Sequence, residues 1–307
     1  MKNQIKRNTM NNNHILLVAL WLALCISGRL LANEPKTELE SGEARLSVKS
    51  FGLEDSTVGD GNASYALAGF GAELEYGSWQ FGVAQQRFDW RNTDDFIEDT
   101  DGRDPWESFT RLHLGFSHSS EFTERWSGEV MTGITGEFEE EIDHSFSAYL
   151  AGYGVYQMNE SLFLMVGAFY SQHQEIQTAF DFIPILGLAW NPEATEGLSI
   201  QLGVPVTRAS WHFNENTRLM LELNSLEGGV ARLADDSPVR PGGYAERVSN
   251  SVYLRFETQI GNGLELSAGI GHSVEREIKL YDSDGGNSRS EDIEQGMGIE
   301  ISLSKSF

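Results

Sequence analysis

The most regular feature of the chain is the alternation of apolar and polar residues in short segments from residue 44 onward. In the segment SVYLRFETQ, the apolar residues Val252, Leu254 and Phe256 are separated by single polar or aromatic residues. The same period of two recurs in RLHLGFS (111–117) and in GLSIQLGV (197–204). This period is typical of β-strands whose two faces meet different surroundings.

Segments of this kind predict fourteen β-strands in one domain that covers 44–307. The number depends on Pro205, which cannot donate to a sheet ladder and is placed in a tight turn within GVPV. Twelve strands are the alternative, because an even number returns both ends of the chain to one side of a membrane barrel. The predicted strands are 44–52, 64–76, 78–90, 108–118, 124–137, 145–157, 161–172, 178–190, 196–204, 206–213, 216–233, 244–258, 262–280 and 296–307.

Short and long connections alternate between these strands. Short ones such as YGSW (76–79) and GNG (261–263) contrast with long polar ones such as 91–107 and 281–295. Aromatic residues gather at the short connections, as expected for a girdle at a membrane interface. They are Tyr76, Trp79, Trp126, Tyr156 and Trp190. The pattern predicts an all-β fold, a single transmembrane antiparallel β-barrel, with a soluble sandwich core as the alternative.

The first residues have the layout of a secretory signal peptide. A basic start is followed by the apolar run 15–26 and by Ala32, after which cleavage is expected. We therefore predict a signal peptide over 1–32 and a short periplasmic segment over 33–43. The single cysteine, Cys25, lies in the signal peptide, so neither disulfides nor thiol chemistry are expected in the barrel.

Charge and hydropathy are both low, at a formal net charge of −24 and a mean hydropathy of −0.33. Such an acidic chain is not expected to bind nucleic acid. Low mean hydropathy remains compatible with a membrane barrel, because only alternate residues of its strands face lipid.

The last strand, GMGIEISLSKSF, alternates apolar residues and ends in an aromatic one. It resembles the C-terminal signal of bacterial outer-membrane proteins, here Ile299, Ile301, Leu303 and Phe307. The resemblance implies recognition by the barrel-assembly machinery and a place in the outer membrane of a Gram-negative bacterium, with lipid and lipopolysaccharide as partners and a monomer favoured. The block 182–205 also resembles a family of outer-membrane barrels of unknown function.

Charged residues at the alternate, inward positions are the candidate functional residues. Lining a wet lumen, they favour a passive channel for small polar solutes or ions, and locked in ion pairs they favour a non-conducting structural or surface-interaction barrel. The lumen-lining candidates are Arg45, Lys49, Glu73, Glu75, Arg111, His113, Glu129, Arg218, Glu222, Arg255, Glu257, Glu265 and Glu300.

Enzyme and metal signatures are weak, and we expect neither a catalytic activity nor a cofactor. Two loop sequences, TDDF with Asp94 and Asp95 and IDHS with Asp143 and His144, resemble the acidic and histidine groups of omptin proteases, a minor alternative. Spaced oxygen ligands in two acidic loops are candidates for bound Ca²⁺ or Mg²⁺, although neither loop is a complete calcium motif. The candidates are Asp99, Asp101, Asp104, Asp282, Asp284 and Asn287.

Overall fold

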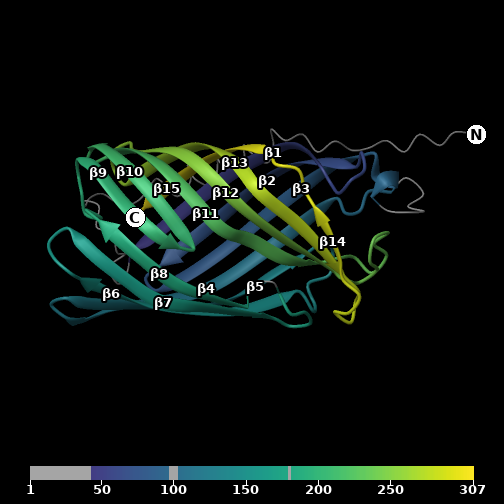
Figure 1. Cartoon of the computed structure of the whole chain (residues 1–307), viewed down its shortest axis with the longest axis horizontal. Coiled ribbons are helices and arrows are strands. Elements are labelled where there is room, and N and C mark those ends of the chain that lie inside the picture. The colour runs from purple at the N-terminus through teal and green to yellow at the C-terminus, as the bar shows by residue number, and fades with distance from the viewer. Residues whose placement is uncertain (1–42, 97–102, 179–180) are drawn as a thin grey trace, which may run out of the picture.

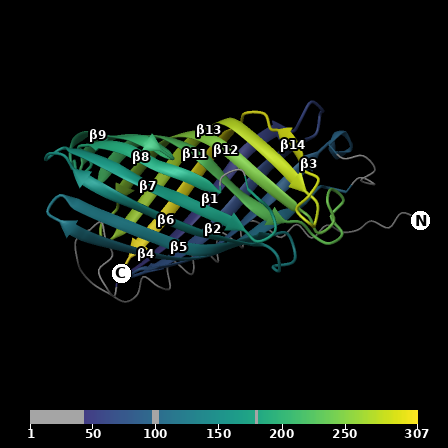
Figure 2. The same ribbon diagram turned by 60° about the horizontal axis from the view of Figure 1, so that its bottom comes forward.

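The computed structural model describes residues 43–96, 103–178 and 181–307, which form a long barrel (Figures 1 and 2). The predicted signal peptide and the segment after it lie outside the described residues, apart from Glu43. The strands are β1 (Ala44–Thr57), β2 (Ser64–Tyr76), β3 (Trp79–Arg91), β4 (Ser108–Thr123), β5 (Trp126–Phe138), β6 (Phe146–Gln157), β7 (Leu162–His173), β8 (Phe182–Trp190), β9 (Gly197–Val204), β10 (Val206–Asn214), β11 (Thr217–Arg232), β12 (Tyr244–Gln259), β13 (Leu264–Tyr281), β14 (Arg289–Asp292) and β15 (Met297–Ser306), with one 3₁₀ turn, η1 (Thr93–Asp95).

Antiparallel pairing of sequence neighbours continues from β1 to β13, and β15 closes the ring by pairing with both β13 and β1. Fourteen of the strands therefore form a closed barrel, as predicted, and the alternative of twelve is wrong. The turn at Pro205 separates β9 from β10 as expected. The sequence analysis missed β14, which pairs with β13 and continues the wall beyond the end of β15.

Two ends of the barrel are distinguished by their connections. We call the part next to the short connections the turn half and the part next to the long connections the loop half. In the turn half the strands expose apolar side chains outward, as β3 does with Trp79, Phe81 and Val83. The predicted girdle residues Tyr76, Trp79, Trp126 and Trp190 are all exposed, and Trp126 packs on Tyr156. The turn half therefore carries an apolar outer belt suited to lipid.

The loop half is filled by a hydrophobic core, which the sequence analysis did not predict. Further along β3, Phe88 and Trp90 point inward and pack on Trp106, which is 1% exposed. Partners across the interior come from the far ends of β11, β12 and β13. The cluster contains Val58, Ala63, Tyr65, Leu67, Phe88, Trp90, Phe96, Trp106, Phe109, Ala231, Leu233, Ala245, Ile278, Leu280 and Ile293. The two sides of the barrel thus meet across the lumen in the loop half.

A backbone contact reinforces this closure. The end of β11 forms a bridge to the end of β5, between Arg232 and Phe138, on the opposite side of the ring. Beyond it, Glu139 N–H donates to the Arg232 carbonyl at 2.9 Å. The loop half is therefore a packed, two-sided structure and not an open tube.

The strands of the barrel are shortest at β8, β9 and β10, which have 9, 8 and 9 residues, while the neighbouring β7 has 12 and β11 has 16. The β9–β10 hairpin ends well short of the loop end of its neighbours (Figure 1). Within the described part of the chain, no helix has the length and apolar character needed to cross a bilayer.

Candidate functional site

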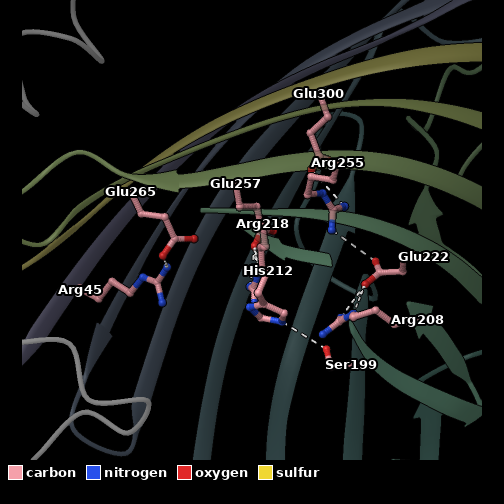
Figure 3. A network of polar contacts seen from close by, with 10 residues as sticks. All are labelled: Arg45, Ser199, Arg208, His212, Arg218, Glu222, Arg255, Glu257, Glu265 and Glu300. Atoms are coloured by element: carbon pink, nitrogen blue, oxygen red, sulfur yellow. Dashed lines mark hydrogen bonds and ion pairs between the residues drawn. The ribbon is translucent and has the colours of Figure 1, made fainter. Parts of the chain in front are cut away.

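The interior of the turn half is lined by ion pairs on one side, from β10 around to β1. Because strand side chains alternate, the residues between the outward apolar ones face the lumen. Arg208 Nε donates to Glu222 at 2.8 Å, and Arg255 lies 3.4 Å from Glu222 and 3.2 Å from Glu300. Lys49 Nζ lies 2.5 Å from Glu300 across the β1–β15 seam. These five residues form a continuous chain of charges, which we call the lumen ladder. Figure 3 shows its members Arg208, Glu222, Arg255 and Glu300.

Nearer the short turns, three more polar contacts line the same side. Arg218 Nε donates to Glu257 at 2.6 Å, and Arg45 Nη2 donates to Glu265 at 3.1 Å. His212 and Ser199 share a hydrogen bond of 3.2 Å between neighbouring strands (Figure 3). Cross-strand pairs of this kind are the contacts expected from the strand register, since Arg218 lies directly opposite Glu257.

The two signs of charge differ in their access to solvent. The side chains of Arg45, Lys49, Arg208 and Arg218 are 34%, 48%, 38% and 41% exposed. Their partners are less exposed, at 7% for Glu222, 11% for Glu300, 12% for Glu257 and 29% for Glu265, and Arg255 is 16% exposed. Four cationic side chains therefore reach accessible space, so the lumen of the turn half is not closely packed around them.

A second polar group lies deeper, beneath the hydrophobic core. Glu137 of β5, 3% exposed, pairs with Arg111 at 2.6 Å and with Arg247 of β12 from the other side of the lumen. Arg247 also stacks over Phe88 and Phe109. This cluster ties β4 and β5 to β12 through the interior.

The remaining lumen candidates occupy the inner faces of β2, β4 and β5. His113 shares a hydrogen bond of 3.1 Å with Thr135, and Glu129 accepts one from Tyr153. Glu73 and Glu75 lie on the inner face of β2. The structure thus joins Arg45 to Glu265, Arg218 to Glu257, and Lys49, Glu222, Arg255 and Glu300 to one another, while Glu73, Glu75, His113 and Glu129 lie outside these groups.

Sequence reasoning missed Arg208, Arg247 and Glu137, which connect the predicted candidates. Each stands at an inward position of its strand, so the alternation itself was the available signal. Arg208 lies opposite Glu222 in the β10–β11 register. Arg247 and Glu137 are paired across the lumen and not along a ladder, and no local pattern reveals such a contact.

Part of the lumen wall, on β7 and β8, carries apolar side chains. The inner faces of β7 and β8 carry Phe163, Met165, Phe169, Ile183 and Ile185, which we call the apolar stripe. Phe169 stacks on Tyr149 of β6 at 6.1 Å between ring centroids. Four of the five residues are partly exposed, and Ile183 is buried. The apolar stripe on β7 and β8 therefore interrupts an inner wall that carries charged residues elsewhere.

The described loop side chains that were proposed as metal ligands contact other groups of the protein. Asp282 accepts from Asn287 at 2.9 Å and lies 3.2 Å from Arg240, while Asp284 accepts from the Gly286 N–H. Asp99 and Asp101 lie outside the described residues, and Asp104 lies in the loop before β4. Among the described residues, no three His, Cys, Asp or Glu side chains are grouped as metal ligands. Ion binding by the loops stays a prediction.

The omptin-like groups are not assembled into a described site. His144 shares a hydrogen bond of 2.7 Å with Glu175, a residue that the sequence analysis had not considered. The side chain of Asp95 lies outside the described residues. The hypothesis of a surface protease therefore gains no geometric support.

The C-terminal residues close the ring. Ile299 and Ile301 are exposed on the outer face of β15, and the Phe307 N–H donates to the Ala44 carbonyl at 2.8 Å. Their outward alternation agrees with the sequence analysis, while their role as an assembly signal stays a prediction.

A closed antiparallel barrel with an apolar outer belt and a lumen lined on one side by charge belongs, as a class, to the transmembrane β-barrels. No family model and no curated protein matches the sequence significantly.

Solved structures of similar shape are themselves membrane barrels. They include an outer-membrane channel from Pseudomonas putida F1 (TM-score 0.48, 7% identity, covering 90% of this chain and 100% of that one) and a KdgM porin (0.36, 8%, 85% and 99%). The outer-membrane protease OmpT from Escherichia coli also matches (0.29, 10%, 89% and 99%). At these levels of overlap and identity, neither a family nor a function follows from the likeness.

Proposed function

We propose that the protein is an outer-membrane barrel of a Gram-negative bacterium that passes small solutes through its lumen. The observation that carries the proposal is the partial exposure of Arg45, Lys49, Arg208 and Arg218 on the inner wall. A barrel whose interior served only to hold its wall together would bury these side chains in its packing.

The proposed place in the outer membrane determines what surrounds each part of the barrel. The apolar belt contacts lipid, the short connections lie in the periplasm and the long ones face outward, where lipopolysaccharide surrounds them. The last strand, with Phe307 at its end, serves as the signal for the barrel-assembly machinery. The fourteen strands close on themselves, so one chain is enough to form the wall.

The test is the conductance of the purified full-length barrel in a planar bilayer, together with liposome swelling in small sugars and amino acids. Passage of ions or small solutes supports the channel. Protein that inserts, shows the gel mobility of a folded barrel and passes none of these solutes contradicts it.

A non-conducting barrel is the second candidate, and the hydrophobic core favours it. Trp106, Phe109, Ile278 and Leu280 belong to the buried cluster that fills the loop half. The two candidates differ in one measurement, because Trp106→Ala would increase conductance only where a wet path already reaches the core from the turn half. The control is Trp126→Ala, which removes an equally large ring from the outer belt.

A further inference from the structure

Four neighbouring strands of the wall contain no charged side chain. β6, β7, β8 and β9 have no Asp, Glu, Lys or Arg on either face, whereas every other strand has at least one. These four strands pair with one another in sequence order, so they form one continuous part of the wall. Its inner face includes the apolar stripe. Arg208 of β10, paired with Gln201 of β9, is the first charged residue at its border.

The lumen ladder, which begins at Arg208, has one more positive than negative charge. Its two carboxylates, Glu222 and Glu300, are both shared with Arg255, and each has one further cation, Arg208 or Lys49. The side chains of these two end cations are 38% and 48% exposed, while Arg255 is 16% exposed. The unbalanced positive charge is therefore accessible at the two ends of the ladder.

The two ends of the ladder differ in their acidic neighbours. Beside Lys49, the inner face of β2 carries Glu73 and Glu75, which add negative charge. Beside Arg208, the register continues through Gln201 of β9 to Ala189 of β8, and both residues are neutral. The positive potential is therefore strongest at the Arg208 end, and an anion in the lumen is attracted there.

The wall between Arg208 and the apolar stripe has little side-chain cover. Gly187 of β8 and Gly203 of β9 are paired on the inner face, and both are partly exposed. The Met165 side chain reaches over Gly187, since a Cβ atom there would lie 2.7 Å from the Met165 Cε. Neighbouring strands are about 4.8 Å apart, so β8 lies roughly 10 Å from β10. A small molecule can therefore touch both the guanidinium and the stripe.

From this juxtaposition we propose that the inner wall from β7 to β10 binds small amphipathic carboxylates. The Nε and Nη2 groups of Arg208 face Glu222 (Figure 3), so Nη1 donates to the ligand's carboxylate, and the Gln201 amide is a second donor beside it. The apolar body of the ligand lies over Gly187 against Met165 and gains from leaving water. The proposal rests on the proposed function, because it names the class of solute that the lumen takes.

The first test uses the unmodified full-length barrel in nanodiscs, with empty nanodiscs as the blank. Equilibrium dialysis measures the binding of trans-cinnamate, of cinnamamide, its neutral amide of the same shape, and of acetate, which has no apolar body. Cinnamate should bind saturably. Cinnamamide should bind about tenfold more weakly, because it loses a charge-assisted hydrogen bond, and acetate should bind more weakly still. Equal binding of cinnamate and either analogue, or no saturable binding of cinnamate, overturns the site.

Arg208 is tested against a cation at a distant place in the lumen. Arg208→Gln should weaken cinnamate binding about tenfold, and Arg208→Lys, which keeps the charge, should restore most of it. Arg45→Gln removes a similarly exposed cation from β1 and should weaken binding less. Equal losses in Arg208→Gln and Arg45→Gln would overturn the location of the site. Gel mobility of each variant confirms that the barrel is folded.

The apolar part of the site is tested in the same assay. Met165→Gln puts an amide on the apolar stripe and should weaken cinnamate binding about fivefold. Met297→Gln makes the same change on the outer face of β15, where Met297 is exposed, and should leave binding unchanged. Equal affinity in the two variants would overturn the stripe as the binding surface.

Conductance of the unmodified barrel without cinnamate separates this proposal from the proposed function. A barrel that conducts ions but does not distinguish cinnamate from cinnamamide overturns the site and leaves the channel. A folded barrel that binds cinnamate as described but passes no ions or solutes overturns the channel and leaves the site.

Discussion

In the turn half of the barrel β3 directs Trp79, Phe81 and Val83 outward, whereas in the loop half the same strand directs Phe88 and Trp90 inward. The β2–β3 ladder runs from Tyr76–Trp79 to Ser64–Arg91 without a register shift, so the backbone does not cause the change. The apolar residues simply move from odd to even positions. Where the outside is lipid the apolar face points out, and where it is water the apolar face points in.

Removing an aromatic residue should have its largest effect in the loop half. Trp106→Ala empties a site that is 1% exposed and should lower the free energy of unfolding by about 3–5 kcal/mol. Trp126→Ala, whose ring is 42% exposed on the outer belt, should cost much less. Denaturant unfolding of the two variants in the same lipid checks this, and equal losses would contradict a distinct core in the loop half.

In the turn half the largest effect should come from the lumen ladder. Arg255→Gln removes the guanidinium that Glu222 and Glu300 share, while Arg208 and Lys49 still pair with these carboxylates. The free energy of unfolding should therefore fall by about 1–3 kcal/mol, less than for a buried charge left alone. Arg45→Gln breaks a more solvated pair, because Arg45 and its partner Glu265 are 34% and 29% exposed, and should cost less than about 1 kcal/mol. Thermal unfolding should rank the variants in this order. The reverse order would mean that Arg255 is the solvated one.

Charged substitutions should be poorly tolerated on the outward face of the turn half. Phe81→Arg places a cation in the belt and should cost roughly 2–4 kcal/mol if the residue lies near the middle of the bilayer. Its neighbour Gln80 faces the lumen, and Gln80→Arg should be far milder. Folding yield into vesicles distinguishes them, and similar yields would place the belt at a different height.

A smaller effect is expected from pH at the edge of the loop half. Burial raises the pKa of Glu139, with nearby Glu140 and Asp236 adding to the shift and the Ala234 N–H opposing it. A carboxyl group whose pKa is raised in the folded state destabilises the fold as pH rises from its ordinary pKa through the raised value. Glu139→Gln should therefore flatten the fall in unfolding temperature across this range. An unchanged slope would assign it to other groups.

The fold was largely predictable because apolar and polar residues alternate along each strand. The predicted segment 64–76 coincides with β2, and 206–213 differs from β10 by one residue. Two strand ends were underestimated where the pattern changed: β1 continues to Thr57 at its loop end, and β4 continues to Thr123 at its short-turn end. There the outside is no longer lipid, so polar outward residues were interpreted as loop.

The site was predictable only in part. Inward charges such as Arg218 and Glu257 follow from alternation, and their pairing follows from the register of neighbouring strands. The contact between Arg247 and Glu137 depends on how closely β5 and β12 approach each other across the lumen, and this approach is set by the whole ring of strands.

The seam between β1 and β15 has a consequence for how the protein is made. Ser47 and Ser304 are 257 residues apart in the sequence and share a hydrogen bond of 2.8 Å. Such non-local pairing is slow to form, and until it forms the first strand presents an open edge that other chains can join. The first strand therefore has no partner on one edge until the last strand has been synthesised, and during that time copies of the chain can join at this unpaired edge.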